Sequence, residues 1–141
     1  MASLILADFY LCCRQLLADE QRLTGLILEM REDFGESHPA VARAPVLIAD
    51  TGDGFMGLFK VDGARIGFQT FPGFEYLALE VYVFTAADPN IYVEYLVEKV
   101  QPQVVSVRQF TRAEHLKADT RPREVQEQES SGKRAGVEDC I

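Results

Sequence analysis

The sequence predicts an α+β two-layer sandwich, in which an antiparallel sheet carries two helices on one face. The hydrophobic pattern has a period of two over several segments and a period near 3.6 over two others. These segments follow one another in the order β-α-β-β-β-β-α-β. Short turns such as Asp62-Gly63 join consecutive strands, which favours antiparallel hairpins.

The first part of the chain is expected to contribute a strand, a helix and a second strand. Residues 4–10 form a short apolar run. Apolar side chains then recur at intervals of four, three and four residues over 23–34, with charged residues between them, which is typical of an amphipathic helix. Asp19 is its expected N-cap and Gly35 its end. Residues 46–49 are predicted to form the second strand.

Residues 55–84 are predicted to form a three-stranded antiparallel meander. Its strands cover 55–61, 65–71 and 76–84, with turns at Asp62-Gly63 and Pro72-Gly73. Successive side chains of a strand point to opposite faces, so the third strand should present one apolar face. That face consists of Leu77, Leu79, Val81 and Val83.

A second helix and a last strand complete the predicted fold. Asp88 followed by Pro89 marks the start of the helix, because Asp caps helices and Pro is tolerated at the first helical position. Pro102 ends the helix. The β-branched run over 104–112 predicts the last strand.

Composition divides the chain into a domain over 1–116 and a tail over 117–141. The tail holds 5 basic and 6 acidic side chains and few apolar ones. Such a segment cannot bury enough surface to offset the entropy of ordering it. We therefore expect a disordered, charged tail.

Charge and cysteine content exclude several classes of protein. With 14 Lys+Arg against 22 Asp+Glu, the net charge of −8 excludes a generic nucleic-acid binder and favours small cationic ligands. The chain has no apolar run of ~18 residues, so no membrane anchor is expected. Cys12, Cys13 and Cys140 have neither metal-ligand spacing nor a disulfide pattern, so no metal site is expected. These features predict a cytoplasmic protein with reduced thiols.

The meander resembles a known family. Its segment Gly-Leu-Phe-Lys-Val-Asp-Gly-Ala-Arg-Ile-Gly-Phe-Gln-Thr-Phe-Pro-Gly-Phe-Glu-Tyr, residues 57–76, is similar to the self-cleavage segment of the small prokaryotic S-adenosylmethionine decarboxylases. The usual form there is Glu-Ser-His-Leu-Ser/Thr-Ile-His-Thr-Trp-Pro-Glu-Tyr-Gly-Tyr. The opening Leu-Ala-Asp-Phe-Tyr-Leu-Cys and the Asp88-Pro89 helix extend the resemblance over about 4–112. It implies the same α+β sandwich and dimers built on its sheet.

The resemblance implies that the family's chemistry is lost. Members cut their own chain between Glu and Ser, and the serine becomes a pyruvoyl group that accepts the electrons of decarboxylation. Gly63-Ala64 falls at this pair, and alanine has no hydroxyl to attack the preceding carbonyl. Thr70 matches a threonine that the family already has, so we do not expect it to substitute. Four more functional positions are changed: the processing serine is Met56, the histidine is Gln69, the ribose-holding glutamate is Gly73 and the acid cysteine is Phe84.

The favoured interpretation is a non-catalytic member of this family, without a pyruvoyl cofactor, which acts by binding. It would form a homodimer, or a heterodimer with an active paralogue whose activity in polyamine metabolism it regulates. One alternative is a protein that binds an adenosyl compound or a polyamine, and another is a divergent decarboxylase or an enzyme with new chemistry. The expected ligand-binding residues are Phe71, Tyr76, Glu80 and Tyr82.

Overall fold

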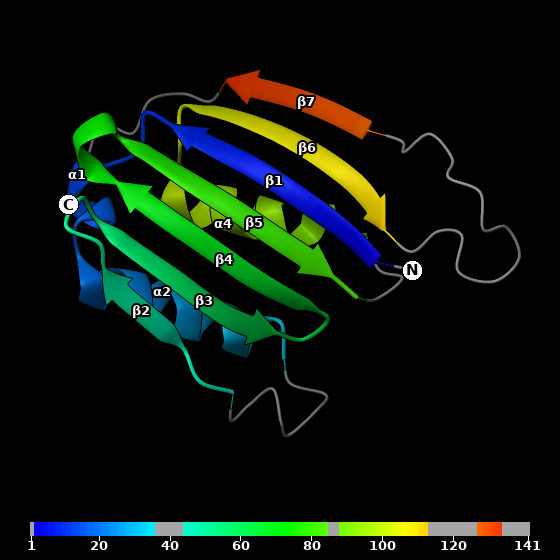
Figure 1. Cartoon of the computed structure of the whole chain (residues 1–141), viewed down its shortest axis with the longest axis horizontal. Coiled ribbons are helices and arrows are strands. Elements are labelled where there is room, and N and C mark those ends of the chain that lie inside the picture. The colour runs from blue at the N-terminus through cyan, green and yellow to red at the C-terminus, as the bar shows by residue number, and fades with distance from the viewer. Residues whose placement is uncertain (1, 36–43, 85–87, 113–126, 134–141) are drawn as a thin grey trace, which may run out of the picture.

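A computed structural model describes residues 2–35, 44–84, 88–112 and 127–133 of the chain, the last range as backbone (Figure 1). Within these ranges, seven strands form one antiparallel sheet in the order β2-β3-β4-β5-β1-β6-β7. The strands are β1 (Ala2–Tyr10), β2 (Leu47–Asp50), β3 (Phe55–Val61), β4 (Ala64–Phe71), β5 (Tyr76–Val83), β6 (Val104–Arg112) and β7 (Glu127–Lys133).

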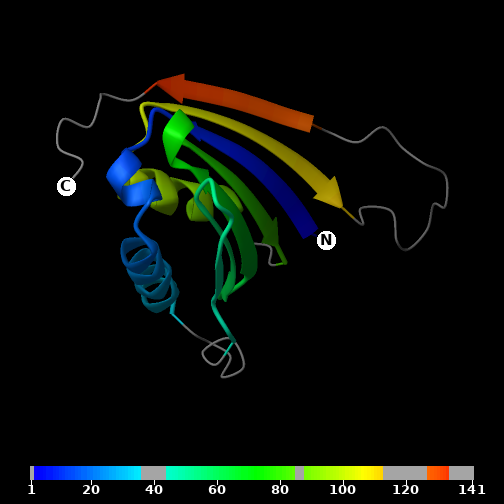
Figure 2. The same ribbon diagram turned by 60° about the vertical axis from the view of Figure 1, so that its left-hand side comes forward.

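The helices pack on one face of this sheet and leave the other face uncovered by any described element (Figure 2). They are α1 (Arg14–Leu17), α2 (Glu20–Asp33) and α4 (Asn90–Val100), and a short 3-10 turn, η1 (Pro72–Phe74), joins β4 to β5. This arrangement confirms the predicted α+β sandwich and its central meander. None of the described helices is long and apolar enough to cross a bilayer.

The helix ends follow the capping signals of the sequence. The backbone N–H of Arg22 donates to Oδ1 of Asp19 at 3.1 Å, which confirms Asp19 as the N-cap of α2. Gly35 follows this helix with a φ of +72°, a conformation that glycine adopts without strain. The start of α4 differs by one residue from the prediction: Pro89 is the N-cap, the helix begins at Asn90, and Asp88 accepts a hydrogen bond from the N–H of Asn90 at 3.0 Å.

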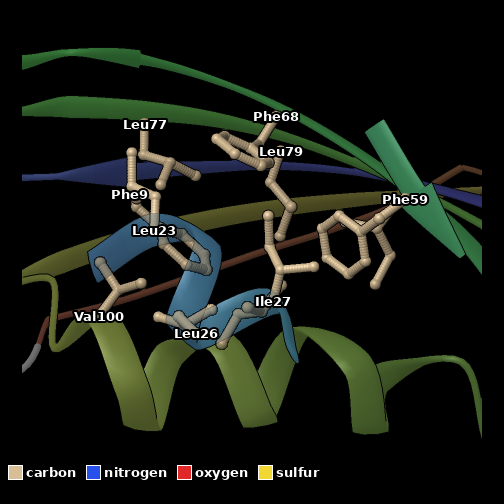
Figure 3. Close-up of a pocket in the computed structure, with 11 residues that line it drawn as sticks. Phe9, Leu23, Leu26, Ile27, Phe59, Phe68, Leu77, Leu79 and Val100 are labelled. Atoms are coloured by element: carbon tan, nitrogen blue, oxygen red, sulfur yellow. The ribbon is translucent and has the colours of Figure 1, made fainter. Parts of the chain in front are cut away.

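The core lies between the sheet and the helices. Leu77, Leu79, Val81 and Val83 are all buried there, as the alternation in β5 predicts. Figure 3 shows side chains of the sheet, such as Phe68 and Leu79, pointing toward Leu23 and Ile27 of α2. Their packing leaves a small apolar cavity of about 30 Å³, which belongs to the core.

Three features differ from the sequence predictions. The sequence pattern places Arg31 on the polar face of α2, but its side chain is only 7% exposed. Its guanidinium donates to the carbonyls of Lys60 and Ala44, which compensates for the burial of the charge. The short elements α1 and η1 carry no periodic signal and are absent from the predicted order.

The third difference concerns the segment predicted to be a disordered tail over 117–141. Its residues 127–133 form β7, which pairs with β6. The backbone N–H and C=O groups along the outer edge of β6 pair with this segment. The amino-acid composition of a segment gives no information about such hydrogen bonds. The other residues of the predicted tail, 117–126 and 134–141, lie outside the described residues, as do 113–116 of the predicted domain.

Candidate functional site

The uncovered face of the sheet, which we call the open face, carries most of the residues that the sequence singles out. Side chains of β4 and β5 that do not point to the helices point here, because successive residues of a strand alternate. Phe71 and Tyr76 are direct cross-strand partners, and Arg65 is the partner of Tyr82. Glu80 lies between the two pairs and is exposed.

A shallow groove of about 440 Å³ crosses the middle of the open face. Met56 of β3 and Gln69 of β4 are cross-strand partners, and both line the groove. Asp8, Glu80 and Arg108 also line the groove. Two carboxylates, a guanidinium and an amide therefore surround a solvent-filled depression, which suits a small charged ligand better than an apolar one.

Two charged groups of the groove, Glu80 and Arg108, are available to a ligand. Glu80 is opposite Leu6 in the sheet, and Leu6 is opposite Arg108. Among the described residues the ion pairs are Arg14 with Glu75 and Lys99 with Glu29, so neither Glu80 nor Arg108 takes part in one.

Phe71 and Tyr76 belong to an aromatic stack at one end of the groove. The ring of Tyr76 lies 5.4 Å from that of Tyr10 and 5.6 Å from that of Phe71, with interplanar angles of 19° and 17°. Its hydroxyl donates to Oδ1 of Asp8. Burial, followed by this hydrogen bond, raises the pKa of Tyr76 above the usual phenol value, so Tyr76 stays a donor at neutral pH.

Gly63, Ala64 and Phe84 meet at the opposite end of the sheet. Gly63 has a φ of +83° in the tight β3–β4 turn. Its carbonyl accepts a hydrogen bond from the N–H of Phe84 at 2.9 Å. Ala64 begins β4, is paired with Val61 and Val83, and has a fully buried methyl group that points to the helix side. Gly63 and Ala64 are thus held by backbone hydrogen bonds and strand pairing where the resemblance places a cleavage site.

The positions matched to the family's catalytic groups form two separate clusters. Gln69 lies five residues beyond Ala64 on β4, which is about 16 Å along an extended strand. The two side chains also point to opposite faces of the sheet. Gly73 lies in η1, beyond the aromatic stack, and is exposed. One copy of the chain therefore does not bring these positions together.

A basic cluster surrounds Tyr82 at the Ala64 end of the open face. The guanidinium carbons of Arg65 and Arg112 lie 5.2 Å and 5.4 Å from the centre of the Tyr82 ring, and Phe84 packs beside it at 5.2 Å. Sequence reasoning missed these arginines. Both arginines lie in predicted strands. The alternation of side chains along those strands places them on the polar face, and this signal would have identified them.

Two side chains with nucleophilic groups, Thr70 and Cys12, are buried in the fold. The hydroxyl of Thr70 is buried, donates to the carbonyl of Leu17 at 2.8 Å and accepts from the N–H of Phe55 at 3.0 Å. Burial, and then the neighbouring Cys13, raise the pKa of the Cys12 thiol to about 12, which keeps it protonated at neutral pH. No group of three metal-ligating side chains is found in the part of the chain that the structure describes.

Comparison with protein-family models identifies the family of this chain. The family model of S-adenosylmethionine decarboxylase matches residues 3–113. The crystal structure of the adenosylmethionine decarboxylase from Aquifex aeolicus VF5 is similar to this structure, with a TM-score of 0.56 over 98% of this chain and 93% of that chain. The two chains are 12% identical, so this similarity establishes the fold alone. A direct sequence search of curated proteins returns no match.

Proposed function

The chain belongs to the S-adenosylmethionine decarboxylase family. We propose that this member neither cuts its own backbone nor decarboxylates a substrate, and that it acts by binding. The observation that carries the proposal is the residue at the cleavage position. Self-cleavage needs a hydroxyl next to the scissile carbonyl, and Ala64 presents only a buried methyl group after the Gly63 carbonyl.

Changes at the other matched positions support the same proposal. Met56 and Gln69 lie side by side in the groove, and neither can exchange a proton at neutral pH. Phe84 provides an aromatic ring where the family has an acid cysteine, and the hydroxyl of Thr70 is engaged in two backbone hydrogen bonds. An enzyme can compensate for the loss of one catalytic group. The loss of the groups at all of these positions would remove both self-cleavage and decarboxylation.

Mass spectrometry tests this proposal. We expect the purified protein to remain a single chain of 15.8 kDa after prolonged incubation. We expect the Ala64→Ser variant to remain intact as well, because no group at positions 56 or 69 can take the proton of the new hydroxyl. Fragments corresponding to 1–63 and 64–141 in the unmodified protein, the second with a blocked N-terminus, would refute the proposal and favour a divergent decarboxylase. Cleavage of Ala64→Ser alone would show that the groups at 56 and 69 are dispensable.

We further propose that two copies of the chain associate through their open faces. Large apolar side chains are exposed there, namely Leu47, Met56, Leu58 and Phe84. Lys60, Arg65 and Arg112 make one end of this face basic, whereas the carboxylates of Asp8 and Glu80 lie farther along the strands. A two-fold axis across the face would set the basic end of each copy near the carboxylates of the other.

Charge reversal at Arg65 tests the dimer. We expect Arg65→Glu to raise the dimer dissociation constant by about tenfold or more in sedimentation velocity experiments, because like charges would then meet across the interface. Glu94→Lys is the matched control, since Glu94 is exposed on α4 in the helix layer, and it should leave association unchanged. Wild-type protein that stays monomeric at high concentration would refute a homodimer and leave a heterodimer with a paralogue to be tested.

A second candidate function is binding of a small cation, such as a polyamine or the sulfonium of S-adenosylmethionine. It is favoured by Glu80, an exposed carboxylate in the groove without an ion-pair partner among the described residues, and by the net charge of −8. A ligand that binds the folded state at ten times its dissociation constant should stabilise it by about 1.4 kcal/mol. We therefore expect spermidine or S-adenosylmethionine to raise the melting temperature, and Glu80→Gln to reduce that rise. The absence of a rise with either compound, at matched ionic strength, would eliminate this candidate.

A further inference from the structure

The outer edge of β6 is covered by the only part of the C-terminal segment that the structure describes. β6 pairs with β1 along one edge from Val104 to Arg112, and with β7 along the other from Val104 to Phe110. Figure 1 shows β7 as the outermost strand beside β6. Without β7, β6 would present a row of unpaired backbone N–H and C=O groups to solvent.

The two strands differ sharply in their tendency to form a sheet. β6 is rich in β-branched and aromatic residues, which are enriched in strands. β7 reads Glu-Gln-Glu-Ser-Ser-Gly-Lys, which contains no β-branched, aromatic or other apolar residue. Its sequence therefore offers nothing to bury, and backbone hydrogen bonds must provide most of the gain from its pairing.

The connection between the two strands is also unusual for a hairpin. Residues 113–126 separate β6 from β7, whereas β-hairpin loops usually have about two to five residues. The pairing of β7 with β6 is therefore not set by a tight hairpin turn between the two strands.

We propose that β7 is a detachable cover of β6, and that the edge beneath it is a docking site for one extended segment of a partner protein. The incoming segment would add as an antiparallel strand in place of β7. The register defines its chemistry. Glu129 is opposite Arg108, so the partner should carry an acid at that position. Positions 130 and 132 are opposite Val107 and Val105, so the partner should carry β-branched residues there.

A labelled probe peptide can test this proposal on the full chain. The probe is Glu-Val-Glu-Val-Thr-Val-Lys, which keeps the acid opposite Arg108 and sets valines opposite Val107 and Val105. A control probe has proline in place of its central valine, because proline removes a backbone donor from the ladder. Binding is followed by fluorescence anisotropy.

Three variants change the competition with β7. Ser130→Pro with Ser131→Pro weakens β7, Ser130→Val with Gly132→Val strengthens it, and Ser130→Ala with Ser131→Ala is the matched control that keeps both N–H groups. Because β7 is a tethered competitor, we expect the probe to bind the proline variant about tenfold more tightly than the wild type, and the valine variant about tenfold more weakly. The alanine variant should bind like the wild type.

Hydrogen exchange provides a second readout. Amides of β6 should exchange faster in the proline variant and regain protection when the probe is added. Equal probe affinity for all variants, binding of the proline-containing probe as tight as that of the first probe, or no binding to the proline variant would each overturn the proposal. The test does not depend on the proposed loss of catalysis, because it measures only pairing at the β6 edge.

Discussion

Replacing Thr70 by valine is expected to destabilise the protein by about 3 kcal/mol, because it leaves two backbone groups without their partner. The Thr70 hydroxyl accepts from the N–H of Phe55, at the start of β3, and donates to the carbonyl of Leu17, at the end of α1. Valine has nearly the same shape but makes neither bond. The loss should appear as a lower midpoint in urea unfolding at fixed protein concentration.

Thr70→Ser separates the hydrogen bonds from the packing of the side chain. It keeps the hydroxyl and loses one buried methyl group, so it should cost clearly less than Thr70→Val. Equal losses for both variants would show that the methyl group, and not the hydroxyl, matters at this position. A stable Thr70→Val protein would contradict the structural role assigned to this residue.

Truncation of Ile27 should have a similarly large effect. Ile27 is 1% exposed in α2 and lines the small cavity under the sheet (Figure 3). Ile27→Ala would enlarge this cavity, and we expect a loss of about 3–4 kcal/mol in the free energy of unfolding.

The neighbouring residue provides the control for this experiment. Leu28 is 51% exposed on the outer side of the same helix, so Leu28→Ala should cost less than about 1 kcal/mol. Comparable losses for the two variants would mean that α2 does not pack on the sheet in the orientation described.

The candidate site was predictable only in part. Glu80 and Tyr82 were found from the alternation of β5, because a period of two can be read within one strand. Asp8, Arg65 and Arg108 were missed, because they come to the open face from other strands and their proximity depends on the order of strands in the sheet. The ligand-binding roles assigned to Phe71, Tyr76, Glu80 and Tyr82 remain predictions, and the rings of Phe71 and Tyr76 are already engaged in a stack.

Two glycines illustrate the same limit. A Cβ atom at Gly57 would lie 2.1 Å from the ring of Phe68, and one at Gly54 would lie 2.1 Å from the backbone oxygen of Thr70. A side chain at position 57 would collide with the Phe68 ring, and one at position 54 would collide with the backbone of Thr70, so neighbouring atoms would have to shift. From the sequence alone, Gly54 is interpreted as a turn residue and Gly57 as a position that matches the family. Neither interpretation predicts the contacts that leave no room for a side chain.

The sequence by itself determined the order of the elements, the central meander, the cap at Asp19 and the buried face of β5. Each of these rests on periodicity, turns or capping within a few residues. The tertiary structure alone decided that Arg31 is buried, that Thr70 joins β3 to α1, that β1 lies between β5 and β6, and that β7 covers the sheet edge. These features depend on contacts between segments far apart in the chain, which only the packed sheet and helices bring together.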